Sequence, residues 1–171
     1  MRTYVALLRA VNVGGTGALP MRDLKRLCER AGFQNVRTYI ASGNLVFDAF
    51  DAEAEVKSTL ETALLAYAGK PIGTAVRSSG EIAAVLAANP FPDAAPSRVV
   101  AIFLDAPPPP DALERVVGLQ GEALRLGLRE IYVHYGAGMA RSKLRIPAAA
   151  AGTARNMNTV AKLAAMAASD A

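Results

Sequence analysis

The segment FQNVRTYIASGNLVF, residues 33–47, contains two short apolar runs that flank a tight turn. Val36–Ile40 is predicted to be one strand and Leu45–Phe47 the next, because β-branched, aromatic and other apolar residues are concentrated there. Between them lies Ser42-Gly43-Asn44, three residue types that are common in turns. The segment therefore predicts a β-hairpin, and the elements around it indicate the sheet to which the hairpin belongs.

Helices and further strands flank the predicted hairpin on both sides. Tyr4–Val11 is apolar at all but one position and predicts a buried strand. The stretch Pro20–Gly32 predicts a helix that a proline opens and a glycine ends. Apolar spacing predicts a second helix over Ala52–Ala68, and Ile72–Val76 follows as a strand. Over residues 3–77 the order is β-α-β-β-α-β, which is the order of the ferredoxin-like motif.

The second half of the chain is expected to repeat the first half incompletely. A break at Asn89-Pro90-Phe91-Pro92 divides the chain into residues 1–92 and residues 93–171. No closing strand is evident in the second half. The expected fold class is therefore α+β, with two ferredoxin-like (βαββαβ-type) halves of which the second is degenerate. The elements expected after residue 80 are helices at Glu81–Ala88, Pro107–Val117 and Asn156–Ala168, a strand at Val99–Leu104, and a hairpin formed by Ala123–Leu128 and Ile131–Tyr135.

The composition excludes several classes of protein. The chain has 171 residues, of which 52% are hydrophobic and 20% charged, so intrinsic disorder is excluded. No apolar run reaches the ~18 residues of a transmembrane helix, and Arg9 interrupts the first apolar stretch, which argues against a signal peptide. One cysteine excludes a disulfide framework. We therefore expect a cytoplasmic protein that does not contact a membrane.

Charge is distributed unevenly along the chain. Residues 1–47 carry a net charge of +5, residues 48–135 carry −5, and residues 136–171 carry +4. Arginine outnumbers lysine by 14 to 5, and arginine is the better bidentate binder of phosphate. Both basic ends would attract phosphate or nucleic acid, although the arginine content is also explained by the composition of the source genome.

A first group of candidate ligand-binding residues is expected at one edge of the first sheet. In a β-α-β-β unit the third strand returns between two parallel strands, so the end of the first strand lies beside the turn that precedes the third. The first helix also begins there, and its free N–H groups favour an anion. A tight turn without a ligand is the alternative, since the loop matches neither the P-loop nor the dinucleotide fingerprint. The candidates are Arg9, Asn12, Gly14, Gly15, Ser42, Gly43 and Asn44.

A second group of candidates is expected near the start of the last helix. There, polar and basic residues again precede an apolar helical pattern. The alternative is that Thr153 or Asn156 only caps the helix, a contribution of about 1 kcal/mol. The candidate ligand-binding residues of this group are Ser142, Lys143, Arg155, Asn156, Asn158 and Thr159.

Metal and cofactor chemistry have little support in the sequence. The chain contains one histidine and one cysteine, whereas a zinc site usually takes four ligands. His134 lies in a predicted strand, and Cys28 falls on the apolar stripe of the first helix, so both are expected to be structural. We expect no metal site and no cofactor.

Five segments carry a family resemblance. They are Leu7–Gly15 (LLRAVNVGG), Gly32–Asn44 (GFQNVRTYIASGN), Asn89–Phe91 (NPF), Ser142–Leu144 (SKL) and Thr153–Val160 (TARNMNTV). Through them the chain resembles domain of unknown function family 1697 over nearly its whole length. It departs from the family pattern at Met157, where that pattern often has tryptophan, so a packing role is the simpler one there. The resemblance implies an α+β fold of two ferredoxin-like halves and implies no established activity.

Three functional hypotheses follow. The first is a binding protein for a small anionic, phosphate-bearing ligand. The second is nucleic-acid binding by the basic N- and C-terminal segments, with an affinity that falls steeply as salt rises. The third is an enzyme of unknown reaction, which requires that Ser42, Lys143 and Arg155 converge in one pocket. The sequence leaves the choice between binding protein and enzyme open, and also leaves the oligomeric state open.

Overall fold

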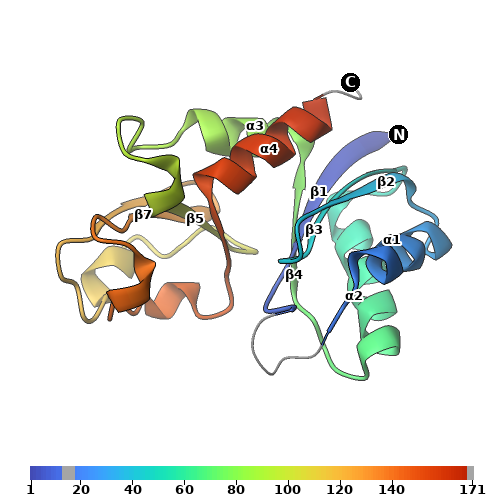
Figure 1. The fold of residues 1–171 in the computed structure, drawn as a ribbon, viewed down its shortest axis with the longest axis horizontal. Helices are drawn as coiled ribbons and strands as arrows, with labels where there is room; N and C mark the ends of the chain where they lie inside the picture. Colours follow the sequence, from blue (N-terminus) through green and yellow to red (C-terminus); the bar gives the residue numbers. More distant parts are fainter. Residues whose placement is uncertain (13–17, 169–171) are drawn as a thin grey trace. The chain divides into compact units, whose positions relative to one another are not determined.

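The protein has a mixed α+β fold with two four-stranded antiparallel sheets (Figure 1). The computed structural model describes residues 1–12 and 18–168. Gly14 and Gly15 of the expected glycine loop lie outside the described residues. The chain divides into two compact units, one formed by Met1–Ala83 with Leu163–Ala171 and the other by Ala84–Lys162.

The sheet of the first unit has the strand order β2-β3-β1-β4. Strand β3 pairs antiparallel with both β1 and β2, so β1 and β2 run in the same direction on either side of it. The predicted position of the returning strand is therefore confirmed. Strand β4 pairs antiparallel with the other edge of β1. The elements are β1 (Arg2–Leu8), α1 (Met21–Arg30), β2 (Gln34–Tyr39), β3 (Asn44–Ala49), α2 (Glu53–Ala68) and β4 (Thr74–Ser78). Helix α3 (Ser79–Ala87) begins in the first unit, and its residues from Ala84 belong to the second.

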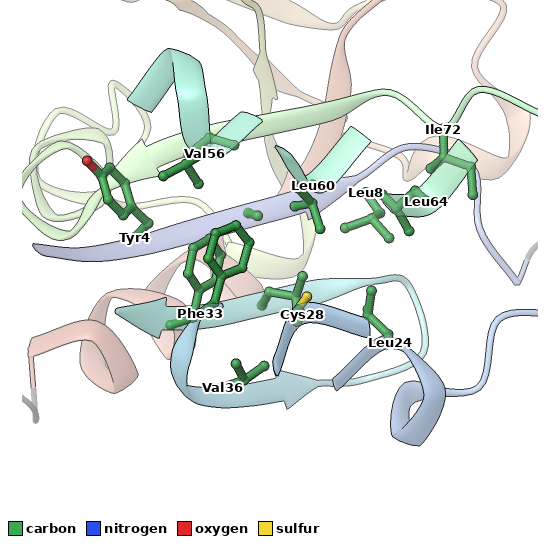
Figure 2. Packing of buried hydrophobic residues seen from close by; sticks show 14 of the residues in the cluster. Tyr4, Leu8, Leu24, Cys28, Phe33, Val36, Val56, Leu60, Leu64 and Ile72 are labelled. Carbon is green, nitrogen blue, oxygen red and sulfur yellow. The ribbon is translucent and has the colours of Figure 1, made fainter. Parts of the chain in front are cut away.

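Helices α1 and α2 pack against one face of this sheet and enclose an apolar core (Figure 2). Helix α1 contributes Leu24 and Cys28, and the spacing of four residues places both on the buried face of the helix. The rings of Phe33 and Phe47 stack at the centre, with 4.4 Å between centroids. Burial raises the pKa of the Cys28 thiol to about 12, with a smaller contribution from Glu29, so the thiol is protonated and structural, as expected.

A polar cluster fastens α2 to β4 beside this core. Lys57 and Glu61, four residues apart on α2, form an ion pair. The Lys57 ammonium also donates to Thr74 O at 2.8 Å, and the Thr74 hydroxyl donates to Glu61 Oε1 at 3.1 Å. Burial works to raise the pKa of Glu61, but the hydrogen bond and charge of Lys57 and the donors of Thr74 outweigh it, so the pKa is lowered.

Replacing Glu61 with glutamine is expected to lower the free energy of unfolding by about 1 kcal/mol at neutral pH. This value lies between the stability contribution of an exposed ion pair on a helix and that of a hydrogen bond to a charged group. Because the folded-state pKa of Glu61 is lowered, its contribution is complete above the unfolded-state pKa and is lost as the pH falls through the folded-state value. Urea denaturation at pH 7 and at acidic pH measures both effects. The difference in the free energy of unfolding between wild type and Glu61→Gln should shrink as the pH falls. Glu55→Gln on the same helix is the control and should lower that free energy by only about a few tenths of a kcal/mol.

The second unit repeats the strand order of the first. Its sheet has the order β6-β7-β5-β8, and all neighbouring strands are antiparallel. The predicted hairpin is confirmed as β6 and β7. The expectation that this half lacks a closing strand is wrong, because the polar residues of β8 pair with β5 from Val100 to Phe103. The strands are β5 (Val99–Phe103), β6 (Ala123–Leu126), β7 (Glu130–His134) and β8 (Thr153–Asn156). Helix α4 (Met157–Ala168) begins in this unit, and its residues from Leu163 belong to the first unit.

The helix expected over Pro107–Val117 is also absent. Only a short 3₁₀ turn forms, at Ala112–Arg115. Four consecutive prolines supply no N–H groups, and each proline disfavours a helical conformation of the residue before it. Val117, two residues after this turn, pairs with Arg145 in an isolated antiparallel β-bridge. One face of the second sheet is consequently covered by this turn and by loop residues such as Ile146, where the first sheet has helices.

Candidate functional site

The end of β1 and the β2–β3 turn meet at one edge of the first sheet, as the sequence predicts. Leu8 N donates to Gly43 O at 2.8 Å. The Asn12 side-chain amide donates to Ala41 O, also at 2.8 Å. These hydrogen bonds join residues about thirty positions apart, so the turn and the strand end form one packed structure.

Left-handed backbone conformations are concentrated at this junction. Ala10, Asn12 and Ile40 have φ angles of 53°, 55° and 52°. Such angles are uncommon for residues other than glycine and are outliers for a β-branched residue such as Ile40. Each strained residue costs on the order of 1–3 kcal/mol, and strain of this kind clusters at ligand sites. The junction is therefore a region where the fold maintains an unusual backbone path.

The polar side chains at the junction bond within the chain. The two N–H groups of the Asn12 amide donate to Leu19 O and Ala41 O, and its oxygen accepts from Leu19 N at 2.6 Å. Asn44 is fully buried and donates to Tyr39 O and to Ser42 Oγ. Asn12 therefore holds the chain just before α1, and the hydrogen bonds of Asn44 hold the β2–β3 turn.

A cavity of about 480 Å³ lies beside this junction. Its walls come from the residues that follow β1, from the residues that precede α1, and from the end of α2 together with the chain that follows. Lys70 supplies a positive charge to an otherwise largely apolar lining. Arg9, a candidate from the sequence, is exposed, and its backbone N–H donates to Gly73 O at 2.9 Å. The lining residues are Ala10, Val11, Ala18, Leu19, Tyr67, Ala68, Lys70 and Ile72.

A larger cavity, of about 600 Å³, lies between α1 and α2. Its charged residues come from α1, and its small apolar residues come from the end of α1 and from α2. Tyr67 lines this cavity and the previous one, so both open around the same side chain. We call the larger cavity the α1–α2 groove. Its lining residues are Asp23, Arg26, Leu27, Arg30, Ala31, Ala63, Ala66 and Tyr67.

The α1–α2 groove carries an excess of positive charge. The Tyr67 hydroxyl donates to Asp23 Oδ2 at 3.0 Å, so the one carboxylate of the groove is engaged by a neutral phenol. This hydrogen bond, together with burial and the charge of Asp23, raises the pKa of Tyr67. In the described part of the chain, neither Arg26 nor Arg30 forms an ion pair or a side-chain hydrogen bond. Two guanidinium groups are therefore available to an anion in the groove.

Arg26 and Arg30 are not among the candidate residues that the sequence predicts. The available signal was their spacing of four residues, which places them on one side of a helix whose apolar positions lie elsewhere. The spacing of Ala63, Ala66 and Tyr67 likewise places two small residues and one aromatic residue on one face of α2. Nothing in the sequence shows that these two faces border the same space, because this depends on how α1 and α2 pack.

The candidates around the last helix lie in different local structures from those expected. Arg155 belongs to strand β8 and does not lie at a helix start; its Nη1 donates to Ala154 O at 2.9 Å, and burial lowers the pKa of its guanidinium to about 10. Asn156 Oδ1 accepts from Thr159 N at 3.0 Å, which is the capping role considered as the alternative. Thr159 is buried, whereas Asn158 is exposed. Met157 is buried, in agreement with a packing role.

The residues of the enzyme hypothesis belong to different units. Ser42 lies in the first unit, and Lys143 and Arg155 lie in the second. Ser142 Oγ accepts from Leu144 N at 3.2 Å, and Lys143 is exposed. Among the residues that the structure describes, no group of three or more His, Cys, Asp or Glu side chains is arranged to hold a metal ion. Within the same residues, no helix has the length and apolar character needed to cross a membrane.

Comparisons with known proteins relate the chain to a family and to a solved fold. The family model described as "Protein of unknown function (DUF1697)" matches residues 1–132. The chain is similar to the solved structure of conserved bacterial protein SP0830 from Streptococcus pneumoniae, with a TM-score of 0.78 and 23% identity over 97% of this chain and 98% of that chain. No curated protein matches the chain. At this level of identity the solved structure shows the fold alone.

Proposed function

We propose that this chain, which belongs to the DUF1697 family of proteins of unknown function, binds a small anionic ligand in the α1–α2 groove of its first unit. The observation that carries the proposal is the pair Arg26 and Arg30, which line one cavity of about 600 Å³ without a partner in the described part of the chain. A phosphate group on the ligand would supply the missing counter-charge.

The chemistry of arginine favours phosphate over other anions. A guanidinium group presents parallel N–H donors that match the oxygen atoms of a phosphate, and such bidentate contacts are stronger than neutral hydrogen bonds. Two arginines spaced by four residues lie about 6 Å apart along a helix axis, so both side chains can reach a single phosphate or two linked phosphates. Asp23 is the only acidic residue in the lining, and Tyr67 donates to it.

The remaining walls of the α1–α2 groove favour a flat apolar group on the same ligand. Ala31, Ala63 and Ala66 leave room at the helix contact, and the ring of Tyr67 lies at the border of the space. The volume lies within the range of small-molecule sites, about 300–1,000 Å³. A ligand that combines a phosphate with a planar ring, as a nucleotide does, fits these walls better than inorganic phosphate.

In this proposal, Asn12 and the Ser42-Gly43-Asn44 turn serve the ligand indirectly. Asn12 bonds both to Ala41, just before the turn, and to Leu19. Leu19 precedes Pro20, and the Pro20 carbonyl accepts from N–H groups in the first turn of α1. Arg9 is exposed near this junction and would add positive charge on the side of Lys70. The strained backbone of Ala10 and Ile40 is then the cost of a fixed entrance to the site.

We also propose that both units follow the ferredoxin-like arrangement, with the second degenerate and the domain boundary between residues 92 and 93. Support comes from the shared strand order, β2-β3-β1-β4 in one sheet and β6-β7-β5-β8 in the other. The single cysteine, buried as a protonated thiol, supports a reducing cytoplasm as the location.

Calorimetric titration with AMP, adenosine and inorganic phosphate tests the proposed function. AMP is expected to bind more tightly than either of its parts. Arg26→Ala and Arg30→Ala should each weaken the binding of AMP by tenfold to about a hundredfold, because a charged hydrogen bond is worth about 1.5–3 kcal/mol. Arg22→Ala is the matched control: it removes the same charge from the same helix, but Arg22 does not line the groove. It should change the affinity by less than threefold.

One feature of α1 favours nucleic acid as the second candidate. Arg22, Arg26 and Arg30 follow one another at intervals of four residues and form a basic stripe along the helix. A single strand bound along this stripe would use all three arginines. The affinity of the protein for the single strand would then fall equally in Arg22→Ala, Arg26→Ala and Arg30→Ala. It would also fall with rising salt, at a log–log slope of about −0.7 for each neutralised phosphate. That pattern, with no binding of AMP, would replace the small-ligand proposal by the nucleic-acid one.

A further inference from the structure

The second unit contains a smaller cavity of about 310 Å³ whose lining differs in chemistry from that of the α1–α2 groove. Three short segments surround it: the turn before β6, the loop after β7, and the end of the 3₁₀ turn at Met139–Arg141. Apart from Ala137 and the glycines, every lining residue has a polar group in its side chain. The lining residues are Gln120, Gly121, Glu122, Tyr135, Gly136, Ala137, Gly138, Arg141 and Ser142.

The pairing of β6 with β7 places a carboxylate beside a phenol in this cavity. Ala123 and His134 form the last pair of the two strands, and Glu122 and Tyr135 are the residues next to this pair in the chain. Burial, and to a lesser degree the negative charge of Glu122, raises the pKa of Tyr135. The phenol is therefore a neutral hydrogen-bond donor at physiological pH. The Glu122 carboxylate accepts from Gln120 N at 3.1 Å, which fixes the turn that carries it.

The loop after β7, which also lines the cavity, is held to the rest of the unit at several points. Tyr135 N donates to Arg98 O at 2.8 Å, and the Arg98 guanidinium donates to Gly136 O. Gly138 has a φ of +96° and donates its N–H to Tyr135 O, which closes the loop. The cavity is thus a built feature of the unit.

Arg141 and Ser142 supply further donors to the cavity. Ser142 Oγ accepts from Leu144 N, and its hydroxyl hydrogen remains to be donated. The Arg141 guanidinium has no ion pair or side-chain hydrogen bond within residues 18–168 or 1–12. The cavity therefore joins one carboxylate and one guanidinium to two hydroxyl groups.

We propose that this cavity binds a small zwitterion of the free amino acid class. Glu122 would accept the ligand's ammonium group, and Arg141 would bind its carboxylate in a bidentate manner. The hydroxyls of Ser142 and Tyr135 supply neutral hydrogen bonds between these two ends. A volume of about 310 Å³, near the lower limit for ligand sites, suits a metabolite of this size and excludes a nucleotide with several phosphates. This site is independent of the α1–α2 groove and does not rest on the function proposed for it.

Titration of the ¹⁵N-labelled protein with the common L-amino acids tests the inference. At least one amino acid should shift the backbone amide signals of Gly121, Gly136 and Gly138. The amide of that amino acid lacks the carboxylate, and its N-acetyl derivative lacks the ammonium group, so both should bind at least tenfold more weakly. Both charges of the ligand are then shown to be recognised.

Variants that each remove one charge distinguish binding in the cavity from a general effect of the protein's charge on affinity. Glu122→Gln and Arg141→Gln should each weaken the binding at least tenfold while the amide spectrum elsewhere is retained. Glu114→Gln and Arg145→Gln change the same charges at exposed positions outside the cavity and should leave the affinity unchanged. Arg26→Ala should also have no effect, which keeps this test separate from that of the first unit. Absence of binding by every amino acid, binding of either derivative as tightly as the amino acid itself, or unchanged affinity in Glu122→Gln would overturn the inference.

Discussion

Replacing Gly43 with alanine is expected to lower the free energy of unfolding by about 3 kcal/mol, which is a large share of the stability of a small protein. Gly43 has a φ of +88°, and a Cβ atom there would lie 2.7 Å from Val11 Cγ2 and 2.9 Å from Leu8 Cβ. The left-handed conformation costs an L-residue about 1–2 kcal/mol, and forcing a methyl group into a packed site costs about 1–3 kcal/mol more. Urea denaturation followed by circular dichroism measures the sum.

Gly32→Ala is the control that separates the two contributions to the Gly43 effect. Gly32 has a similar φ of +97°, but a Cβ atom there would meet nothing within 4 Å. This variant should therefore lose only the backbone contribution, about 1–2 kcal/mol. Equal losses in Gly32→Ala and Gly43→Ala would contradict the close packing of the turn against the end of β1.

Truncation of Phe47 to alanine is expected to cost about 3–5 kcal/mol, the usual range for a large aromatic side chain in a core. Phe47 is completely buried on β3, stacks on Phe33, and lies 6.1 Å from the ring centroid of Tyr4. Its removal leaves a cavity in the core of the first unit, because closely packed side chains around it relax only in part.

Phe50→Ala provides the comparison for Phe47 with the same chemical change three residues further along the chain. The Phe50 side chain is 76% exposed, so its loss should alter the free energy of unfolding by less than about 0.5 kcal/mol. Chemical denaturation of both variants gives the two values. A loss below about 1 kcal/mol in Phe47→Ala would show that the sheet and its helices do not share the core described above.

The sheet of the first unit was predictable because local and tertiary signals agree there. The apolar runs of β1 and β3 are buried in the core, and a turn glycine between β2 and β3 occupies the left-handed conformation that such a turn requires. The right-handed crossover then places the returning strand. For the same reason, the meeting of Asn12 with the β2–β3 turn followed from the order of the elements.

Elsewhere, tertiary contacts decided what local patterns could not. Strand β8 contains Arg155 and Asn156 and has a weak strand propensity, so its pairing with β5 determines its conformation. The proline run before Ala112 shortened an expected helix to a single turn. The α1–α2 groove was not foreseen, because Arg26 and Tyr67 are 41 positions apart and meet only when the two helices pack.

The most direct test of the proposed function is the titration of the ¹⁵N-labelled protein with AMP, followed by backbone amide signals. Binding in the α1–α2 groove predicts shifts at Arg26, Arg30, Ala63, Ala66 and Tyr67 that saturate together with one dissociation constant. In Arg26→Ala, the same shifts should need at least tenfold more AMP to saturate. Signals of Arg22 and of the second unit should stay in place. Saturable shifts that avoid these five residues, or no shift at any concentration of AMP, would contradict the central claim that the first unit is an anion-binding module.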